Sequence, residues 1–465
     1  MLIIAPEGIS ARARLGLPLA AAFAGRLCRA APQPARPNIL FIAVDDLNTD
    51  VGCWGHPLVQ TPNIDRLARR GVRFDRAYAQ YPVCNPSRTS FLSGRYPETA
   101  GVLDNRTNPR THLTNAVFLP EVLRRAGYFT ARVGKIFHDG MDGPQDWDVS
   151  LDPRPQTKIG RTGEGRNLTG GKLAFAEWRA AEGTDEDQPD GLIAAEAVRL
   201  LSEKRGRPFF LGVGFRKPHD PYIAPRKYFE PYPLEKIACP EGPPGDEKDI
   251  PAAAYPPARW SLGREESREY RRAYYACTTF MDAQLGKVLR ALEASPAAGN
   301  TIVIFFGDHG LHLGEHGWFN KVTLFERSAR VPLIIAPAGA AAPGAVCRRP
   351  VELLGLYPTL AELCKVTPPP GLEGESLAPL LRNPEGTWSR PAYTVVARGG
   401  RLGRAIRTER FRYTEWDEGR AGVELYDHFT DPHEYHNLSG DPDYARVERE
   451  MKQTLASAGP KNKPA

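Results

Sequence analysis

The sequence predicts an α/β protein with a large, mainly parallel sheet flanked by helices and a smaller antiparallel sheet near the C-terminus. The first observation is a set of continuous apolar runs of strand length, at 39–44, 208–215 and 301–306, separated by segments with helical spacing. Runs that are apolar at every position are typical of parallel strands buried on both faces. The second observation is the tail, where short strand-like runs alternate with charged turns. This pattern favours a small antiparallel sheet.

The composition limits the classes of function. The chain has 465 residues, 41% of them hydrophobic and 25% charged, which suits one large domain and a smaller one. A net charge of +6 is small for this length. This charge is too small to indicate a nucleic-acid-binding protein, but it is compatible with a polyanionic substrate. No apolar run is long enough to span a membrane.

The first residues differ from the rest of the chain. Arg12 and Arg14 precede an uncharged run at 15–25, an arrangement that resembles a secretory signal. We therefore expect a periplasmic or secreted protein. Glu7 and the length of the leader are atypical, so a misassigned start codon or a disordered tail is the alternative. The predicted parts are a leader at 1–35, a catalytic domain at 36–385 and a C-terminal subdomain at 386–465, whose strand-like runs are 392–397, 403–408, 411–416 and 424–427.

The cysteines do not indicate a disulfide framework. Of the seven, Cys28 lies in the leader and Cys84 has a catalytic role proposed below. The five that remain are an odd number, so we expect mostly free, buried thiols.

The first predicted strand, 39–44, ends at a pair of carboxylates, Asp45 and Asp46. In open α/β sheets ligands bind beyond the carboxyl ends of the strands. Two carboxylates at that place suit a hard cation. A single aspartate there would more often be a turn residue or a helix cap.

Cys84 lies at the start of a short predicted helix. Pro86 suits the first helical turn, where its missing N–H is not needed, and Gly94 suits the left-handed position that ends a helix. Free amide N–H groups and the positive end of the helix dipole favour an anion there, and Arg88 lies one turn further on the same side. We predict an oxyanion-binding cup around a nucleophile, although a lone cysteine is more often a small buried hydrophobic residue.

Lys135 and His138 follow the next predicted strand. A helix at 118–126 and a strand at 128–133 lead to them, and they offer an anion a point charge and a proton carrier. A solvated lysine and a loop histidine are the default alternative. The segment 140–190 is rich in Gly, Pro, Asp and Arg and is interpreted as a long surface excursion, a usual place for substrate specificity.

His219 lies in a proline-rich loop at the end of the strand 208–215. Prolines make this loop rigid, which holds an imidazole in position. A predicted helix at 194–201 precedes the strand. A second proline-rich loop at 240–266 and a long helix at 270–292 follow, the helix with apolar residues at the spacing of a buried face.

The strand at 301–306 also ends at groups that can ligate a metal, Asp308 and His309. A loop containing Lys321 then leads to a strand at 331–336. Because the carboxyl ends of parallel strands share one edge of the sheet, these distant groups can meet at one ion. Carboxylates with one histidine suit Ca²⁺, and Mg²⁺ or Mn²⁺ are not excluded. The ligands that these positions predict are Asp45, Asp46, Asp308 and His309.

The motifs resemble those of one family. The run C-x-P-S-R followed by x-x-x-L-x-G-R, beginning at Cys84, is similar to the signature of the type I sulfatases of the alkaline phosphatase superfamily, with Ser93 where threonine is usual. The Asp308-His309 pair, the spacing of Lys135 and His138, and K-P-H at 217–219 most resemble the iduronate-2-sulfatase branch. Further motifs extend the resemblance from position 36 to about 438: P-N-I-L-F-I-A-V-D-D-L, T-P-N-I-D-R-L-A, G-K-I-F-H, G-D-H-G-x-x-L-G-E-H, R-V-P-L and E-L-Y-D-H-x-x-D-P-x-E.

The resemblance implies an alkaline phosphatase-like fold and a sulfatase mechanism. A maturation enzyme would oxidise Cys84 to formylglycine, whose hydrate attacks sulfur and, with Asp45, Asp46, Asp308 and His309, binds Ca²⁺. His219 would be the general acid for the leaving alcohol, and His138 would accept a proton when sulfate is expelled. The residues that would balance charge on the sulfate and the hydrate are Lys135, Lys321 and Arg88.

The expected activity is therefore removal of sulfate from sulfated uronic acids or related glycans. A phosphonate or phosphate monoester hydrolase is the second possibility, because such a metal site accepts either tetrahedral anion. An arylsulfatase acting on a non-glycan ester is a third. A sulfated-glycan-binding protein without activity would lack a ligand or nucleophile, and every position is filled.

Overall fold

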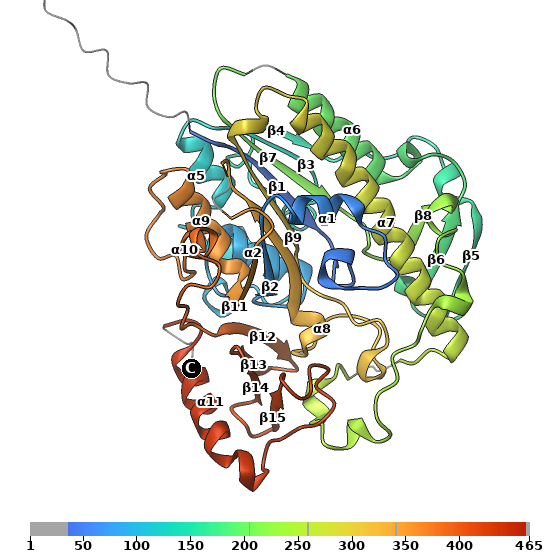
Figure 1. Cartoon of the computed structure of the whole chain (residues 1–465), viewed down its shortest axis with the longest axis vertical. Coiled ribbons are helices and arrows are strands. Elements are labelled where there is room, and N and C mark those ends of the chain that lie inside the picture. The colour runs from blue at the N-terminus through green and yellow to red at the C-terminus, as the bar shows by residue number, and fades with distance from the viewer. Residues whose placement is uncertain (1–35, 204, 258–259, 340–341, 462–465) are drawn as a thin grey trace, which may run out of the picture. The chain divides into compact units, whose positions relative to one another are not determined.

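The main sheet has eight strands in the order β11-β2-β10-β9-β1-β7-β3-β4 (Figure 1). Neighbours from β9 through β1, β7 and β3 to β4 are parallel, whereas β10 is antiparallel to both of its neighbours. This confirms the predicted mainly parallel sheet. The strands are β1 Asn38–Val44, β2 Val72–Tyr78, β3 Phe129–Gly134, β4 Val149–Leu151, β7 Phe209–Phe215, β9 Thr301–Gly307, β10 Arg330–Ala336 and β11 Val346–Glu352.

This computed structural model describes residues 36–203, 205–257, 260–339 and 342–461. The predicted leader, 1–35, lies outside the described residues. Contacts group Arg36–Ala465 into one compact unit, and the predicted boundary at 385/386 stays a prediction. In the described part of the chain, no helix is both long and apolar enough to cross a membrane.

Side chains of β1 alternate between two apolar layers. Ile39, Phe41 and Ala43 contact the layer that includes helices α2, α5 and α9, whereas the intervening residues of β1 contact α1, α6 and α7. A strand buried on both faces explains why the run is apolar at every position. The helices are α1 Pro62–Ala68, α2 Cys84–Ser93, α5 Leu119–Arg125, α6 Pro189–Ser202, α7 Arg264–Glu293 and α9 Leu356–Leu363; shorter ones are α3 Pro97–Ala100, α4 Pro109–His112, α8 Glu326–Ala329 and α10 Ala378–Arg382.

The ends of three central strands lie at one level. Val44, the last residue of β1, is paired with Gly307 on β9 and Phe215 on β7. The ladder continues past the strands, because Asp308 N–H donates to Val44 O (3.0 Å) and Asp45 N–H donates to Phe215 O (3.1 Å). The register therefore brings residues about 260 positions apart in sequence to one edge of the sheet.

Part of the predicted excursion is a small sheet. β5 Gly163–Asn167, β6 Glu177–Ala181 and β8 Tyr222–Pro225 form three strands in the order β5-β6-β8. Its strands have only four or five residues each, and β5 is mostly polar or glycine, so the sequence pattern did not reveal them. Strands β6 and β8 pack against α7, and β8 directly follows the loop that carries His219.

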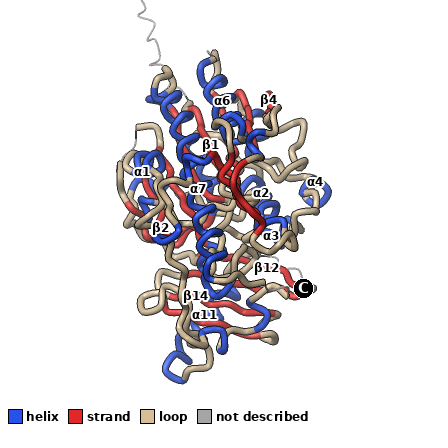
Figure 2. The backbone as a smooth tube through the Cα atoms, turned by 90° about the vertical axis from the view of Figure 1, so that its right-hand side faces the viewer, coloured by secondary structure: helices blue, strands red, loops and turns tan. Residues whose placement is uncertain are grey.

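The C-terminal sheet agrees with the prediction. β12 Ala392–Arg398, β13 Arg401–Arg407, β14 Phe411–Trp416 and β15 Gly422–Asp427 pair antiparallel in chain order. Figure 2 shows helix α11, Ala445–Ser457, lying against this sheet. The sheet is joined to the segment before Cys84, because Val395 N–H donates to Gln80 O at 2.9 Å. Buried Arg412 also donates to Glu326 and Glu434, 2.5 Å each.

Candidate active site

Asp45 and Asp46 follow β1 at the edge where the central strands end. Asp46 has a positive φ of 62°, which non-glycine residues seldom adopt and which is common at functional sites. Two contacts hold it: the hydroxyl of Tyr274 donates to Asp46 O (2.9 Å), and Asp46 N–H donates to Asp308 Oδ1 (3.0 Å). The turn therefore directs two neighbouring carboxylates into the same region.

Cys84 is the first residue of α2, and its side chain is buried. Gly94 ends the helix with a φ of 69°, as predicted. Most of the amide groups expected to be free at this helix start already have acceptors within the protein. Asn85 N–H donates to the side-chain oxygen of Asn105, and Ser87 N–H donates to Val83 O. Proline at 86 has no N–H. Side-chain cations, rather than backbone amides, therefore make the surroundings of Cys84 suitable for an anion.

Lys321 and His309 contact the sulfur of Cys84. Lys321 Nζ and His309 Nε2 each lie 3.4 Å from the Cys84 Sγ. Lys321 also donates to Asp46 Oδ1 at 2.5 Å. The Nδ1 of His309 lies 2.9 Å from Gly310 O, so this nitrogen donates to the carbonyl and Nε2 is left to face the site.

Arg88 and Lys135 bind the other carboxylates. Arg88 is fully buried and donates to Asp308 Oδ2 (2.8 Å) and Asp45 Oδ1 (3.1 Å). Its remaining contacts are to backbone carbonyls of Lys135 and Ile136. Lys135 Nζ donates to Asp45 Oδ2 at 2.6 Å. Arg88 thus holds the carboxylates in place, and each buried charge has a partner, as burial requires.

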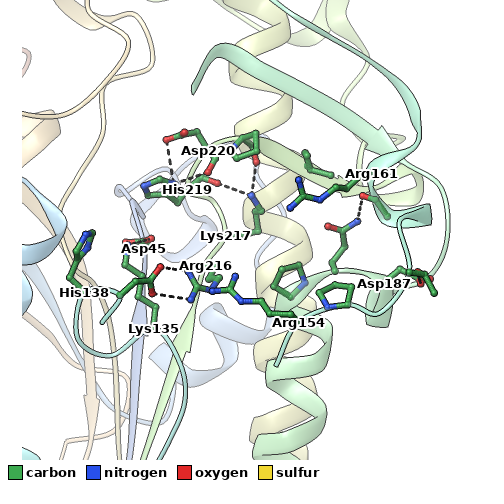
Figure 3. A pocket seen from close by; sticks show the side chains of 18 residues that line it. Asp45, Lys135, His138, Arg154, Arg161, Asp187, Arg216, Lys217, His219 and Asp220 are labelled. Atoms are coloured by element: carbon green, nitrogen blue, oxygen red, sulfur yellow. Dashed lines mark hydrogen bonds and ion pairs between the residues drawn. The ribbon is translucent and has the colours of Figure 1, made fainter. Parts of the chain in front are cut away.

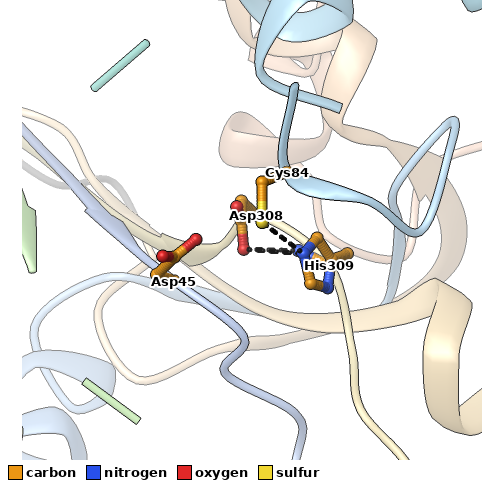
Figure 4. A group of neighbouring side chains, drawn as sticks. All are labelled: Asp45, Cys84, Asp308 and His309. Carbon is orange, nitrogen blue, oxygen red and sulfur yellow. Dashed lines mark hydrogen bonds and ion pairs between the residues drawn. The ribbon is translucent and has the colours of Figure 1, made fainter. Parts of the chain in front are cut away.

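The clustered side chains fit a divalent cation. One ligand atom each from Asp45, Cys84, Asp308 and His309 lies within 4.8 Å of the others (Figure 4). Asp46 belongs to a second such group, with Cys84 and His219, and its Oδ1 is 3.2 Å from His309 Nε2. Carboxylate oxygens with one imidazole nitrogen are ligands that Ca²⁺ accepts, and Mg²⁺ or Mn²⁺ fit the same donors.

His219 and His138 lie at the mouth of this cluster. His219 Nδ1 is 2.7 Å from the carbonyl of Asp220, and its Nε2 lies 4.0 Å from Asp46 Oδ2. His138 follows β3 and lines the same cavity as Asp45 and His219 (Figure 3). The structure thus brings the predicted proton carriers to the carboxylate cluster.

The local charges lower the pKa of the Cys84 thiol to about 6. Burial and the carboxylate of Asp45 raise it, but Lys135, Lys321 and His309 outweigh them. An anionic group at this position is therefore stabilised by its surroundings.

The two histidines at the mouth have shifted pKa values of opposite direction. Burial lowers the pKa of His219, but the carboxylates of Asp46 and Asp45 outweigh burial and raise it to about 10. Burial, assisted by Lys135 and Arg88, lowers the pKa of His138 to about 4. At neutral pH these values correspond to one charged and one neutral imidazole.

A cavity of about 560 Å³ opens beside the cluster (Figure 3). Its walls include Asp45, Lys135 and His219, and also groups that the sequence analysis did not assign. For Arg154, Arg161 and Asp187 the signal was the arginine- and aspartate-rich composition of the excursion, and no local pattern reveals where these residues lie in the fold. The additional charged lining residues are Asp139, Arg154, Arg161, Asp187, Arg216, Lys217 and Asp220.

The chain is similar to several known proteins. A family model described as Sulfatase matches residues 37–366, and one described as N-sulphoglucosamine sulphohydrolase, C-terminal, matches 314–461. The chain is 35% identical over 426 residues to a "Sulfatase" of Formosa agariphila, covering 86% of this chain and 83% of that one. It is 35% identical over 387 residues to the iduronate 2-sulfatase of Mus musculus, covering 72% and 69%. The solved phosphonate monoester hydrolase of Agrobacterium radiobacter superposes with a TM-score of 0.75 and 25% identity, over 91% of this chain and 95% of that one.

Proposed function

Because the chain belongs to the sulfatase family, it is a sulfuric ester hydrolase, and we propose that it desulfates a sulfated uronic acid or related glycan. The observation that carries the proposal is the place of Cys84. Its sulfur lies 3.4 Å from both Lys321 Nζ and His309 Nε2, among carboxylates of which Asp45 lines a cavity. The similarity to an iduronate 2-sulfatase supports the choice of substrate class.

Conversion of Cys84 to formylglycine is part of the proposal. The aldehyde would supply a hydrated carbon whose hydroxyl is a nucleophile toward sulfur. Because Cys84 is only 1% exposed, a maturation enzyme would reach it in the chain before folding is complete. The partners are thus this enzyme and a sulfated carbohydrate.

We also propose that the site binds Ca²⁺, with Mg²⁺ or Mn²⁺ as alternatives. The ion would supply Lewis acidity at a sulfate oxygen. Its ligands would be Asp45, Asp46, Asp308, His309 and the converted residue 84. The mutual proximity of these groups supports the assignment.

The chain's own residues would handle charge and protons. Lys135 and Lys321 would stabilise the sulfate oxygens, while Arg88 keeps the carboxylates in position, since its donors are occupied by them and by backbone carbonyls. His219 would donate a proton to the leaving alcohol, and His138 would accept one as sulfate leaves. Both histidines border the cavity in which the alcohol would lie.

Matched cysteine variants test the proposal. The wild type and Cys84→Ala, each coexpressed with a formylglycine-generating enzyme, are assayed on defined heparin, dermatan and algal oligosaccharides, and the peptide mass at Cys84 is measured. Cys347→Ala removes another buried thiol and serves as the control. We expect sulfate release from the wild type and the control and none from Cys84→Ala, with equal circular dichroism. Comparable release by Cys84→Ala would falsify the mechanism.

A second candidate is hydrolysis of phosphonate or phosphate monoesters. The superposition with a phosphonate monoester hydrolase supports it. Matched aryl esters of sulfate, phosphate and methylphosphonate separate the two candidates by kcat/KM. A preference for aryl sulfate over every glycan would instead indicate an arylsulfatase. Binding of glycans with no turnover of any ester by the converted enzyme would indicate a non-catalytic binding protein.

We propose that the protein is exported to the periplasm or secreted, because two arginines precede an uncharged run in the leader. Fractionation of cells that express the full chain, with N-terminal sequencing of the product, tests it. Recovery of the uncleaved chain from the cytoplasm would contradict the proposal.

A further inference from the structure

We propose that Arg161 and Lys217 form a second anion-binding subsite, which binds a carboxylate or a second sulfate on the same substrate. The proposal rests on the proposed sulfatase function and adds a requirement for where the substrate carries charge. Both residues line the 560 Å³ cavity that borders the carboxylate cluster. In the view of Figure 3, Asp45, Lys135 and His138 lie on one side of the cavity and Arg161 on the other.

Most charges in the cavity wall already have partners. Arg216 donates to Asp139 (3.0 and 3.1 Å) and to Asp152 (3.1 Å). A guanidinium nitrogen of Arg154 lies 2.7 Å from Oδ2 of the same Asp152. Since these guanidinium groups are neutralised by carboxylates of the protein, they have less to offer to a ligand.

Lys217 differs, because its ammonium contacts backbone carbonyls only. Lys217 Nζ donates to His219 O (2.8 Å) and Pro221 O (2.5 Å). Lys217 as a whole is only 8% exposed. The buried carboxylate of Asp190 accepts the backbone N–H of Lys217 at 2.9 Å instead. Among the described residues, no carboxylate forms an ion pair with this ammonium, which carries one more N–H than its two carbonyl contacts use.

Arg161 lies on a short 3-10 turn, Ile159–Arg161, whose backbone is fixed. Gln188 Nε2 donates to Gly160 O at 2.7 Å. Gly160 packs so closely that a Cβ there would lie 2.2 Å from Asp187 O. In the part of the chain that the structure describes, the Arg161 guanidinium has no ion pair, and in Figure 3 it points toward Lys217.

Two cations without carboxylate partners therefore face one cavity. Arg161 is exposed whereas Lys217 is buried, and cations that line one cavity attract an anionic group to it. A guanidinium offers paired N–H donors to a carboxylate or sulfate, and an ammonium adds a point charge. Lys135 and Lys321 would stabilise the oxygens of the sulfate that is cleaved. The pair Arg161 and Lys217 is thus available for a second anionic group.

The experiment compares three disaccharides built on one 2-O-sulfated uronic acid and N-acetylglucosamine. The first keeps the uronate carboxylate, the second is reduced at that carboxyl, and the third is reduced but carries a 6-O-sulfate on the glucosamine. The converted wild type is compared with Arg161→Gln and Arg161→Lys. Lys158→Gln removes an exposed cation from the same loop that does not line the cavity, and it serves as the control.

We expect Arg161→Gln to raise KM about tenfold on a substrate with the second anion, the order of a charged hydrogen bond. The same variant should leave KM on the second disaccharide within twofold of wild type, and Arg161→Lys should recover part of the affinity. A raised KM of Arg161→Gln on the first disaccharide would identify the second anion as the uronate carboxylate. A raised KM on the third would identify it as the 6-O-sulfate. Equal effects on all three, or none on any, would overturn the subsite.

Binding without turnover separates this proposal from the proposed function. Titration calorimetry with Cys84→Ala measures Kd for the same three disaccharides, with and without Arg161→Gln. A higher Kd for the first or third disaccharide when Arg161→Gln is added to Cys84→Ala supports the subsite, even if the wild type releases no sulfate. Identical Kd values for the two proteins would overturn it even where the wild type is an active sulfatase.

Discussion

Tyr274 on the long helix α7 clamps the turn that carries Asp46. Its hydroxyl donates to Asp46 O at 2.9 Å and accepts the N–H of Asn48 at 2.8 Å. The contact spans more than two hundred positions of sequence and fixes a residue whose φ is 62°. A buried tyrosine thus sets the direction of a proposed metal ligand without itself reaching the cavity lining.

The first prediction is that Tyr274→Phe lowers kcat by about tenfold. The change leaves a buried carbonyl and a buried N–H without a partner, which costs about 1–3 kcal/mol of unfolding free energy, and it loosens Asp46. Tyr232→Phe is the control, because the hydroxyl of Tyr232 also accepts a backbone N–H, that of Gln60 at 2.9 Å, outside the site. Urea denaturation and kcat are measured on each variant.

We expect both variants to lose stability but only Tyr274→Phe to lose activity. Unchanged kcat in Tyr274→Phe would show that the clamp does not position the site.

The second prediction concerns removal of the metal. The carboxylates of Asp45, Asp46 and Asp308 are paired with Lys135, Lys321 and Arg88, so the chelated protein should stay folded. Added Ca²⁺ at about 100 times its Kd should then stabilise the fold by about 2.7 kcal/mol, because it binds the native state only. Thermal denaturation of the chelated protein, with and without Ca²⁺, measures the shift in Tm.

Asp308→Asn should abolish that Tm shift, since it removes one charge from the proposed ligand set. Asp417→Asn, in an exposed turn where the carboxylate pairs with Arg420, should keep it. Equal Ca²⁺-dependent shifts in both variants would place the ion elsewhere.

The third prediction is a pH-dependent contribution of Glu352 to stability. Burial raises the pKa of this glutamate from 4.5 to about 7, because the charged form is poorly solvated. The neutral form is favoured in the folded state, so its stabilising contribution is complete below pH 4.5 and is lost as pH rises toward 7. The loss amounts to about 3 kcal/mol.

Glu352→Gln stays neutral and keeps an oxygen acceptor for the Tyr393 N–H and the Tyr96 hydroxyl. Its unfolding free energy, relative to wild type, should therefore increase between pH 4.5 and pH 8. Glu418→Gln, at an exposed turn, is the control and should show no such trend. A difference between Glu352→Gln and wild type that is constant with pH would contradict the prediction.

The sequence predicted the central strands well and the outer ones poorly. β1, β7 and β9 are buried on both faces, so their apolar runs are unmistakable. β11 was not predicted, because it lies at the edge of the sheet and its residues Val346–Glu352 include two exposed or half-buried arginines. The strands of the small sheet are short, and Gly163–Asn167 has no apolar side chain, so only pairing with neighbours makes it a strand.

By itself, the sequence determined which residue types follow each central strand: Asp45 and Asp46 after β1, Asp308 and His309 after β9, and Cys84 before a short helix. These are local properties of apolar runs and of helix start and stop signals. Tertiary structure decided that Arg88 faces the carboxylates, that Lys321 reaches Cys84, and that Arg161 and Lys217 line one cavity. Such contacts depend on strand register and on loops packed over a distance, which no local pattern encodes.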